Sequence, residues 1–141
     1  MAGIYRLARV ARKRVVVFTW DPSAVGFWLI DDYFPKIGTI DREILPTMDE
    51  IRQGLGRASI FPVPIPHDCT DGFLGAYWRR PESYLDPSVR RAISTFAKLS
   101  EIEPGLERLR ADLSSGEWRR RHGAVLSKDA LDLGYRLIVA A

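Results

Sequence analysis

An imidazole and two carboxylates lie close together near the middle of the sequence. His67, Asp68 and Asp71 follow an apolar segment, 58–65, that is expected to form a strand. An imidazole can act as a general base near neutral pH, and a neighbouring carboxylate can orient it. The alternative is structural, because Thr70 or Asp71 could cap the helix that follows. We favour the cap for at least one of Thr70 and Asp71, and keep His67 and Asp68 as candidates for ligand contact.

A second candidate position lies at the end of the apolar run VVVFTW, residues 15–20. Trp20 closes this run and Asp21 follows it. Ligands of α/β proteins bind beyond the carboxyl ends of parallel strands, so both side chains are candidates for substrate binding. Asp21-Pro22 is also a common strand terminator, and turn formation is the interpretation that we favour for Asp21.

A third group combines aromatic and basic side chains. Tyr77 and Trp78 precede Arg79 and Arg80 in the sequence. The guanidinium groups could bind an acidic molecule through paired hydrogen bonds, but positive charge also favours the C-terminal end of a helix. We favour the helix end for the arginines. The complete set of candidate substrate-binding residues is Trp20, Asp21, His67, Asp68, Tyr77 and Trp78.

Four aromatic residues between 23 and 35 could form a lid over a pocket, but aromatic helix faces more often pack into a core. We favour the core for these residues, which are Phe27, Trp28, Tyr33 and Phe34.

The composition argues against several classes of function. The chain has 141 residues, a net charge of +3, two histidines and one cysteine, Cys69. These residues offer neither an internal disulfide nor metal-ligand spacing, so we expect no metal. The basic residues come in short groups rather than one stripe, so we expect no nucleic-acid partner. No apolar run approaches the ~20 residues of a membrane span, and we expect a cytoplasmic protein.

The elements alternate in the manner of an α/β fold. We expect a helix over 3–11, strands over 14–20, 58–65 and 134–140, and helices in the regions between them. Within this first strand, residues 15–20 are apolar at every position except Thr19, which is typical of an interior strand covered on both faces. Little else in the chain could flank that strand on one side. We therefore infer that neighbouring strands are missing.

Several segments together resemble one enzyme family. They are the helix and strand LARVARKRVVVFTWDP from residue 7, then DCTDGF from 68, YWRRPE from 77, YLDP from 84 and LDLGYRL from 131. The chain resembles the C-terminal part of class I S-adenosylmethionine-dependent methyltransferases. Within that family it is most similar to bacterial small-molecule enzymes of the ubiquinone-biosynthesis type.

The resemblance implies a fold. Residues 1–141 would be a single partial domain, the C-terminal half of a Rossmann-like methyltransferase sheet. Its three strands would be 14–20, 58–65 and 134–140, the last running antiparallel and inserted between the other two. Several helices would cover the sheet, with those in 23–56 and 67–122 on the acceptor side.

The resemblance also implies a function. The complete family enzyme binds S-adenosyl-L-methionine and transfers its methyl group to a small-molecule acceptor. This chain contains one Gly-x-Gly, Gly54-Leu55-Gly56, and it precedes a strand instead of following one. We therefore expect no cofactor-binding residues, no cofactor bound by this chain alone, and an inactive fragment. The sequence identifies no catalytic residue.

The alternative is a non-catalytic α/β interaction module. An incomplete sheet exposes a strand edge, which favours pairing with another chain. The partner would be a second copy of this chain or a separate N-terminal half.

Overall fold

Helices and strands alternate along the chain in the predicted order. The computed structural model describes residues 2–141, without the side chains of Ala2, Ile4 and Tyr5. The helices are α1 (Ala2–Val10), a π-helical turn η1 (Leu29–Tyr33), α2 (Pro35–Ile44), α3 (Met48–Leu55), η2 (Leu74–Tyr77), η3 (Pro81–Leu85), α4 (Pro87–Arg91), α5 (Ser94–Ala97), α6 (Glu103–Ser115), α7 (Glu117–His122) and η4 (Gly123–Ser127). The strands are β1 (Val15–Trp20), β2 (Ala58–Pro62), β3 (Ile65–Pro66), β4 (Ala130–Leu131) and β5 (Tyr135–Ala140).

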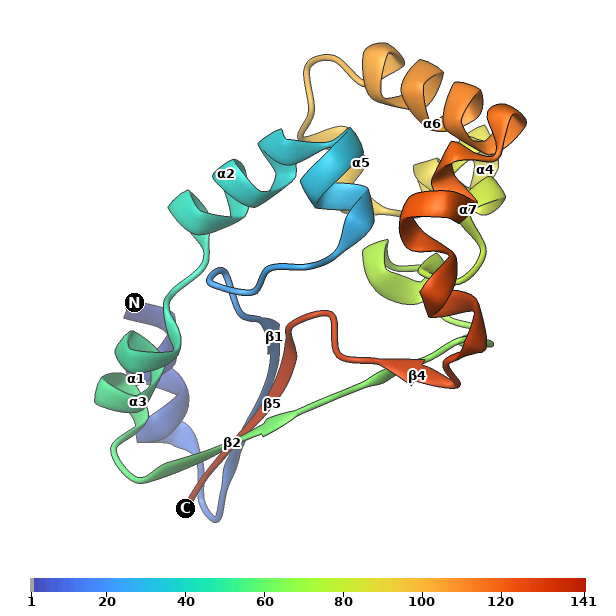
Figure 1. Cartoon of the computed structure of the whole chain (residues 1–141). Coiled ribbons are helices and arrows are strands. Elements are labelled where there is room, and N and C mark those ends of the chain that lie inside the picture. The colour runs from blue at the N-terminus through green and yellow to red at the C-terminus, as the bar shows by residue number, and fades with distance from the viewer. Residues whose placement is uncertain (1) are drawn as a thin grey trace.

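Three strands form the main sheet in the order β1-β5-β2 (Figure 1). The last strand runs antiparallel to both neighbours, so β1 and β2 are parallel to each other. The register places Val16 opposite Val139, and both Phe18 and Phe61 opposite Leu137. The predicted insertion of the C-terminal strand between the other two is confirmed. A separate ribbon of β3 and β4 continues from the end of β2.

The prediction that β1 is covered on both faces is wrong for the described chain. Val15 is buried, whereas Val16 is 60% and Phe18 is 55% exposed. Helix α3 covers one face, where Ile51 packs with Val15 and Ile138. Within residues 2–141, β1 pairs on one side only, with β5, so it is an edge strand. Its apolar sequence therefore leaves one face and one edge uncovered.

The larger core is rich in aromatic residues and joins η1 and the start of α2 to the helices of the second half, with Trp20 and Tyr135 of the sheet packed against it. Trp28 is at its centre. Its ring makes edge-to-face contacts with Tyr33, Tyr84 and Trp118, and its indole N–H donates to the carbonyl of Trp78 at 2.9 Å. Phe27, Trp28, Tyr33 and Phe34 are all buried, which confirms the core interpretation of these aromatic residues.

Side-chain hydrogen bonds cap the start of two helices. The Thr47 side chain accepts from the amide of Glu50, and the Glu50 carboxylate accepts in return, which forms a capping box for α3. Asp86 accepts from the amide of Ser88 at the start of α4, with Pro87 in the first helical position. The single helix expected after Asp86 is divided into α4 and α5.

The helical turn η1 ends at Tyr33, and Pro35 begins α2, where a missing amide costs nothing. One expectation about helix starts is wrong. Neither Thr70 nor Asp71 caps a helix. The next helical turn, η2, follows Phe73 and has no side-chain cap. None of the helices described within residues 2–141 combines the length and the apolarity that crossing a bilayer requires.

Candidate functional site

A cavity of about 300 Å³ opens beside the carboxyl end of β1. Its walls come from five parts of the chain: the end of β1 with the start of β5, the segment 27–30 at the start of η1, helix α2 with the residue after it, the segment 72–74 at the start of η2, and residues 92–98 around α5. Five aromatic side chains line it, Phe18, Trp20, Phe27, Phe73 and Tyr135. Four polar side chains also line it, Asp41, Ser94, Thr95 and Lys98. This size and mixture of groups are typical of a small-molecule site.

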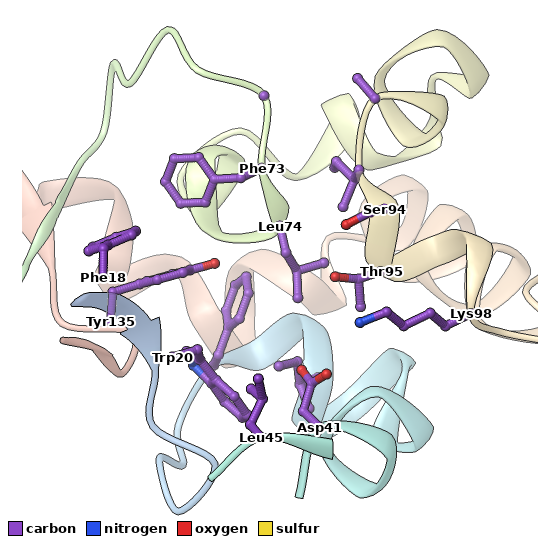
Figure 2. A pocket seen from close by; sticks show the side chains of 15 residues that line it. Phe18, Trp20, Asp41, Leu45, Phe73, Leu74, Ser94, Thr95, Lys98 and Tyr135 are labelled. Carbon is purple, nitrogen blue, oxygen red and sulfur yellow. The ribbon is translucent and has the colours of Figure 1, made fainter. Parts of the chain in front are cut away.

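Aromatic contacts fix one wall of the cavity. The rings of Phe18 and Tyr135 stack with centroids 5.6 Å apart, and Phe73 meets Tyr135 edge-on at 5.2 Å (Figure 2). The Trp20 indole N–H donates to the carbonyl of Leu133 at 2.8 Å. These contacts hold the rings before any ligand enters, so the wall is preformed.

Tyr135 is held from a second side. The backbone amide of Gly75 donates to the phenol oxygen at 3.1 Å. A Cβ atom on residue 75 would lie 2.6 Å from the Tyr135 ring, so glycine is required for this close approach. Burial raises the pKa of Tyr135 to about 12, and the phenol is therefore neutral at physiological pH.

Asp41 provides the buried charge of the site. It lies on α2, is only 9% exposed, and points into the same space as the Lys98 ammonium (Figure 2). Among the residues that the structure describes, none donates a hydrogen bond to its carboxylate or forms an ion pair with it within 4.0 Å. Burial raises the pKa of Asp41, and the positive charge of Lys98 partly opposes this effect. A carboxylate in this position can accept a hydrogen bond from a ligand.

Of the sequence candidates, Trp20 lines the cavity and Asp21 does not. The Asp21 carboxylate accepts from the amide of Ser23 at 2.9 Å and from its hydroxyl at 2.7 Å. These bonds belong to the turn after β1, in agreement with the structural interpretation that we favoured for this residue.

The other candidates lie away from the cavity. His67 is half-buried, while Asp68 and Asp71 are exposed, and no hydrogen bond joins these three described side chains. Trp78 is fully buried, and its indole N–H donates to the carbonyl of Ile65 at 2.9 Å. The Tyr77 ring packs against the guanidinium of Arg80, 4.8 Å from the ring centroid. The structure therefore does not bring these candidates together into one site.

Sequence reasoning missed Asp41, although a signal was present. Ile37, Asp41 and Leu45 are spaced by four residues, so they share one face of α2. Ile37 is completely buried, and a carboxylate on the same face is unusual for an aspartate. Lys98 offered no such signal, because only the tertiary fold brings α5 to this cavity.

Two further findings bear on cofactors. Within residues 2–141, no group of three or more His, Cys, Asp or Glu side chains could hold a metal ion. Gly54 and Gly56 end helix α3 and lead into β2, and Gly56 has a φ of 72°. This glycine pair is a helix end and not a turn after a strand, so it does not fit the cofactor loop of a nucleotide-binding fold.

Comparison with known proteins gives one informative match. Neither a protein-family model nor a curated protein matches the chain. A crystal structure from Anabaena variabilis, of a candidate methyltransferase from an antibiotic biosynthesis pathway, matches with a TM-score of 0.86. The two sequences are 37% identical over a match that covers 98% of this chain and 59% of the other, so this chain spans less than two thirds of its neighbour. Over nearly its whole length, the chain has the fold of part of a methyltransferase.

Proposed function

We propose that this chain forms the acceptor-binding part of a methyltransferase that uses S-adenosyl-L-methionine and acts on a small molecule. The observation that carries the proposal is the 37% identity to the Anabaena methyltransferase structure at a TM-score of 0.86. In this proposal, residues 1–141 correspond to the C-terminal half of a Rossmann-like methyltransferase domain, as the sequence resemblance implies.

The cavity supports a small-molecule acceptor. It lies at the carboxyl end of β1, where ligands of α/β sheets bind, and five aromatic side chains line its walls. We assign the acceptor to this cavity, with Trp20 among the residues that contact it. Asp21, His67, Asp68, Tyr77 and Trp78 are not part of the assignment, because they do not line the cavity.

The methyl donor requires residues that this chain does not provide. A sulfonium nucleotide needs a backbone-lined turn after a strand, and Gly54-Leu55-Gly56 ends a helix instead. We propose that the donor is bound by a further part of the enzyme, and that residues 1–141 alone do not transfer a methyl group.

A transfer assay tests the proposal. S-adenosylmethionine with a labelled methyl group is supplied together with a mixture of small aromatic acceptors. We expect no labelled product with this chain alone. We expect product when the part of the Anabaena enzyme that this chain does not cover is supplied as a second polypeptide. Transfer by the chain alone, or failure of the two parts to restore transfer although they form a complex, would contradict the proposal.

A second candidate function is a non-catalytic interaction module. The exposed face of the sheet favours it, since Val16, Phe18 and Phe61 are at least half exposed. Size-exclusion chromatography of the isolated chain distinguishes the two functions. A stable homodimer that neither binds nor is dispersed by the uncovered part of the Anabaena enzyme would favour the module.

A further inference from the structure

We propose that Asp41 selects the ligand of the cavity, and that this ligand is a planar, uncharged molecule with a hydroxyl group that donates a hydrogen bond to the Asp41 carboxylate. The inference rests on the proposed function only where it calls this ligand the methyl acceptor. The binding preference itself can be measured without a methyl donor.

The first argument is that Asp41 differs from Asp21, Asp32, Asp86 and Asp132, whose carboxylates all have donors in the protein. Asp21, Asp86 and Asp132 each accept a hydrogen bond from a nearby backbone amide. Asp32 accepts from Arg121 at 2.7 Å and lies 2.6 Å from the His122 ring nitrogen. Asp41 is the most buried of these five and has no such donor among the described residues. The Asp41 carboxylate faces the cavity, where a ligand hydroxyl would supply the donor that the described residues do not.

The second argument is the shape of the cavity. The stacked pair of Phe18 and Tyr135 presents a flat wall, and Trp20 lies beside it (Figure 2). Flat aromatic side chains bind planar rings over a large area, by stacking or by edge-to-face contact. Asp41 projects from α2 into the same space, so a bound ring can turn one polar edge toward it.

The third argument is charge. An aromatic cavity with one carboxylate could also bind an organic cation. Here Lys98 carries a positive charge on the same cavity and faces Asp41 (Figure 2). The two charges offset each other, and the ammonium repels a cationic ligand. An uncharged hydroxyl avoids this repulsion and still supplies the donor that Asp41 lacks.

Calorimetric titration with three probes tests the inference. The probes are naphthol, naphthalene and naphthyltrimethylammonium, which share a ring system and differ in the polar group. We expect the wild-type chain to bind naphthol about tenfold more tightly than naphthalene, and the cation most weakly. We expect Asp41→Leu to remove the preference for naphthol and to leave naphthalene binding within about twofold. The control Asp129→Leu replaces an exposed carboxylate outside the cavity and should preserve the preference.

A second variant distinguishes a loss of binding from a loss of the fold. Asp41→Asn keeps the shape of the side chain and removes its charge, and circular dichroism checks the fold of each variant. We expect Asp41→Asn to weaken naphthol binding at least about threefold, because hydrogen bonds to charged acceptors are stronger than those to neutral ones.

The outcomes separate this inference from the proposed function. Equal binding of naphthol and naphthalene by the wild-type chain, a preference that survives in folded Asp41 variants, or tightest binding of the cation would overturn the inference. None of these results depends on methyl transfer. Conversely, an Asp41-dependent preference for naphthol would support the inference even if the two-part transfer assay gave no product.

Discussion

At the scale of single residues, Asp41 is expected to favour ligand binding and to lower the stability of the ligand-free fold. The Asp41 residue is only 9% exposed, and no described residue donates to its carboxylate, so its charge is less well solvated in the folded protein than in the unfolded chain. Natural proteins retain such groups where binding requires them, and replacing them commonly stabilises the fold. The same residue that we propose to select the ligand should therefore lower the stability of the ligand-free protein.

This conflict predicts that Asp41→Leu is more stable than the wild type. We expect the free energy of unfolding to rise by about 1 kcal/mol at neutral pH, because the leucine side chain has no charge to desolvate. Thermal and urea denaturation of both proteins measure the difference. Asp129→Leu serves as the control, and it should change stability by no more than about 0.5 kcal/mol because residue 129 is exposed.

The pH dependence of stability provides a second test of this prediction. Burial raises the pKa of Asp41 above its ordinary value of 3.8, so the folded protein binds this proton more tightly than the unfolded chain does. The contribution of Asp41 to the free energy of unfolding is therefore most favourable at acid pH. It falls as the pH rises above 3.8 through the pKa of the folded state, and it stays low at higher pH. The advantage of Asp41→Leu should therefore be larger at about pH 7 than at about pH 4. An equal advantage at both pH values would contradict this account of Asp41.

The sequence identified a single cavity residue better than it identified which residues lie close together in the fold. Trp20 was identified because the end of a strand is visible in the local pattern, and it does line the cavity. His67, Asp68 and Asp71 were grouped because they are close in the sequence, but none of the three lines the cavity. Asp41 and Lys98 are 57 positions apart in the sequence. Only tertiary packing brings them together, and no local pattern contains that information.

At the scale of elements, glycine positions show which packing contacts are closest. In α6, a Cβ atom on Gly105 would lie 2.6 Å from the carbonyl of Tyr33 and 2.5 Å from the ring of Phe34. The backbone of α6 therefore packs directly against η1. In α2, a Cβ atom on Gly38 would be nearest the flexible end of Arg42, at 3.2 Å, and 3.4 Å from Ile30.

These two glycines form a matched pair of substitutions. We expect Gly105→Ala to lower the free energy of unfolding by about 1–3 kcal/mol, because α6 must move away from η1. We expect Gly38→Ala to be neutral or to raise stability by up to about 1 kcal/mol, since alanine favours a helix and Arg42 can move. Chemical denaturation measures both. A stable Gly105→Ala protein would show that the contact between α6 and η1 is looser than the structure indicates.

The elements were predictable where local chemistry determines them. The capping box at Thr47 and the Asp86-Pro87 start are short-range signals of this kind. Pro35 is another, since it follows the end of η1 and opens α2. The strand order β1-β5-β2 came from the family resemblance, since periodicity contains no information about which strands become neighbours.

At the scale of the whole molecule, the main consequence is the uncovered face of the sheet. The strand pattern predicted cover on both faces of β1. The described chain covers the face that α3 contacts and, on the other face, the end at Trp20 and Tyr135. Val16, Phe18 and Phe61 remain exposed on the other face, in register with Val139 and Leu137 of β5. A contiguous apolar surface of this kind favours association with another polypeptide. In the proposed enzyme, the part that binds the methyl donor covers it.

This surface predicts the association behaviour of the isolated chain. Without a second polypeptide, we expect residues 1–141 to self-associate through the uncovered face. Phe61→Lys should weaken that association about tenfold or more, because it replaces a ring worth roughly 1.5–3 kcal/mol when buried with a charge. Val25→Lys is the matched control, since Val25 is 86% exposed and lies outside the sheet. Size-exclusion chromatography over a range of concentrations should shift only Phe61→Lys toward the monomer. If the wild-type chain were a monomer at every concentration, or if both variants shifted equally, this face would not drive association, and its apolar residues would need another explanation.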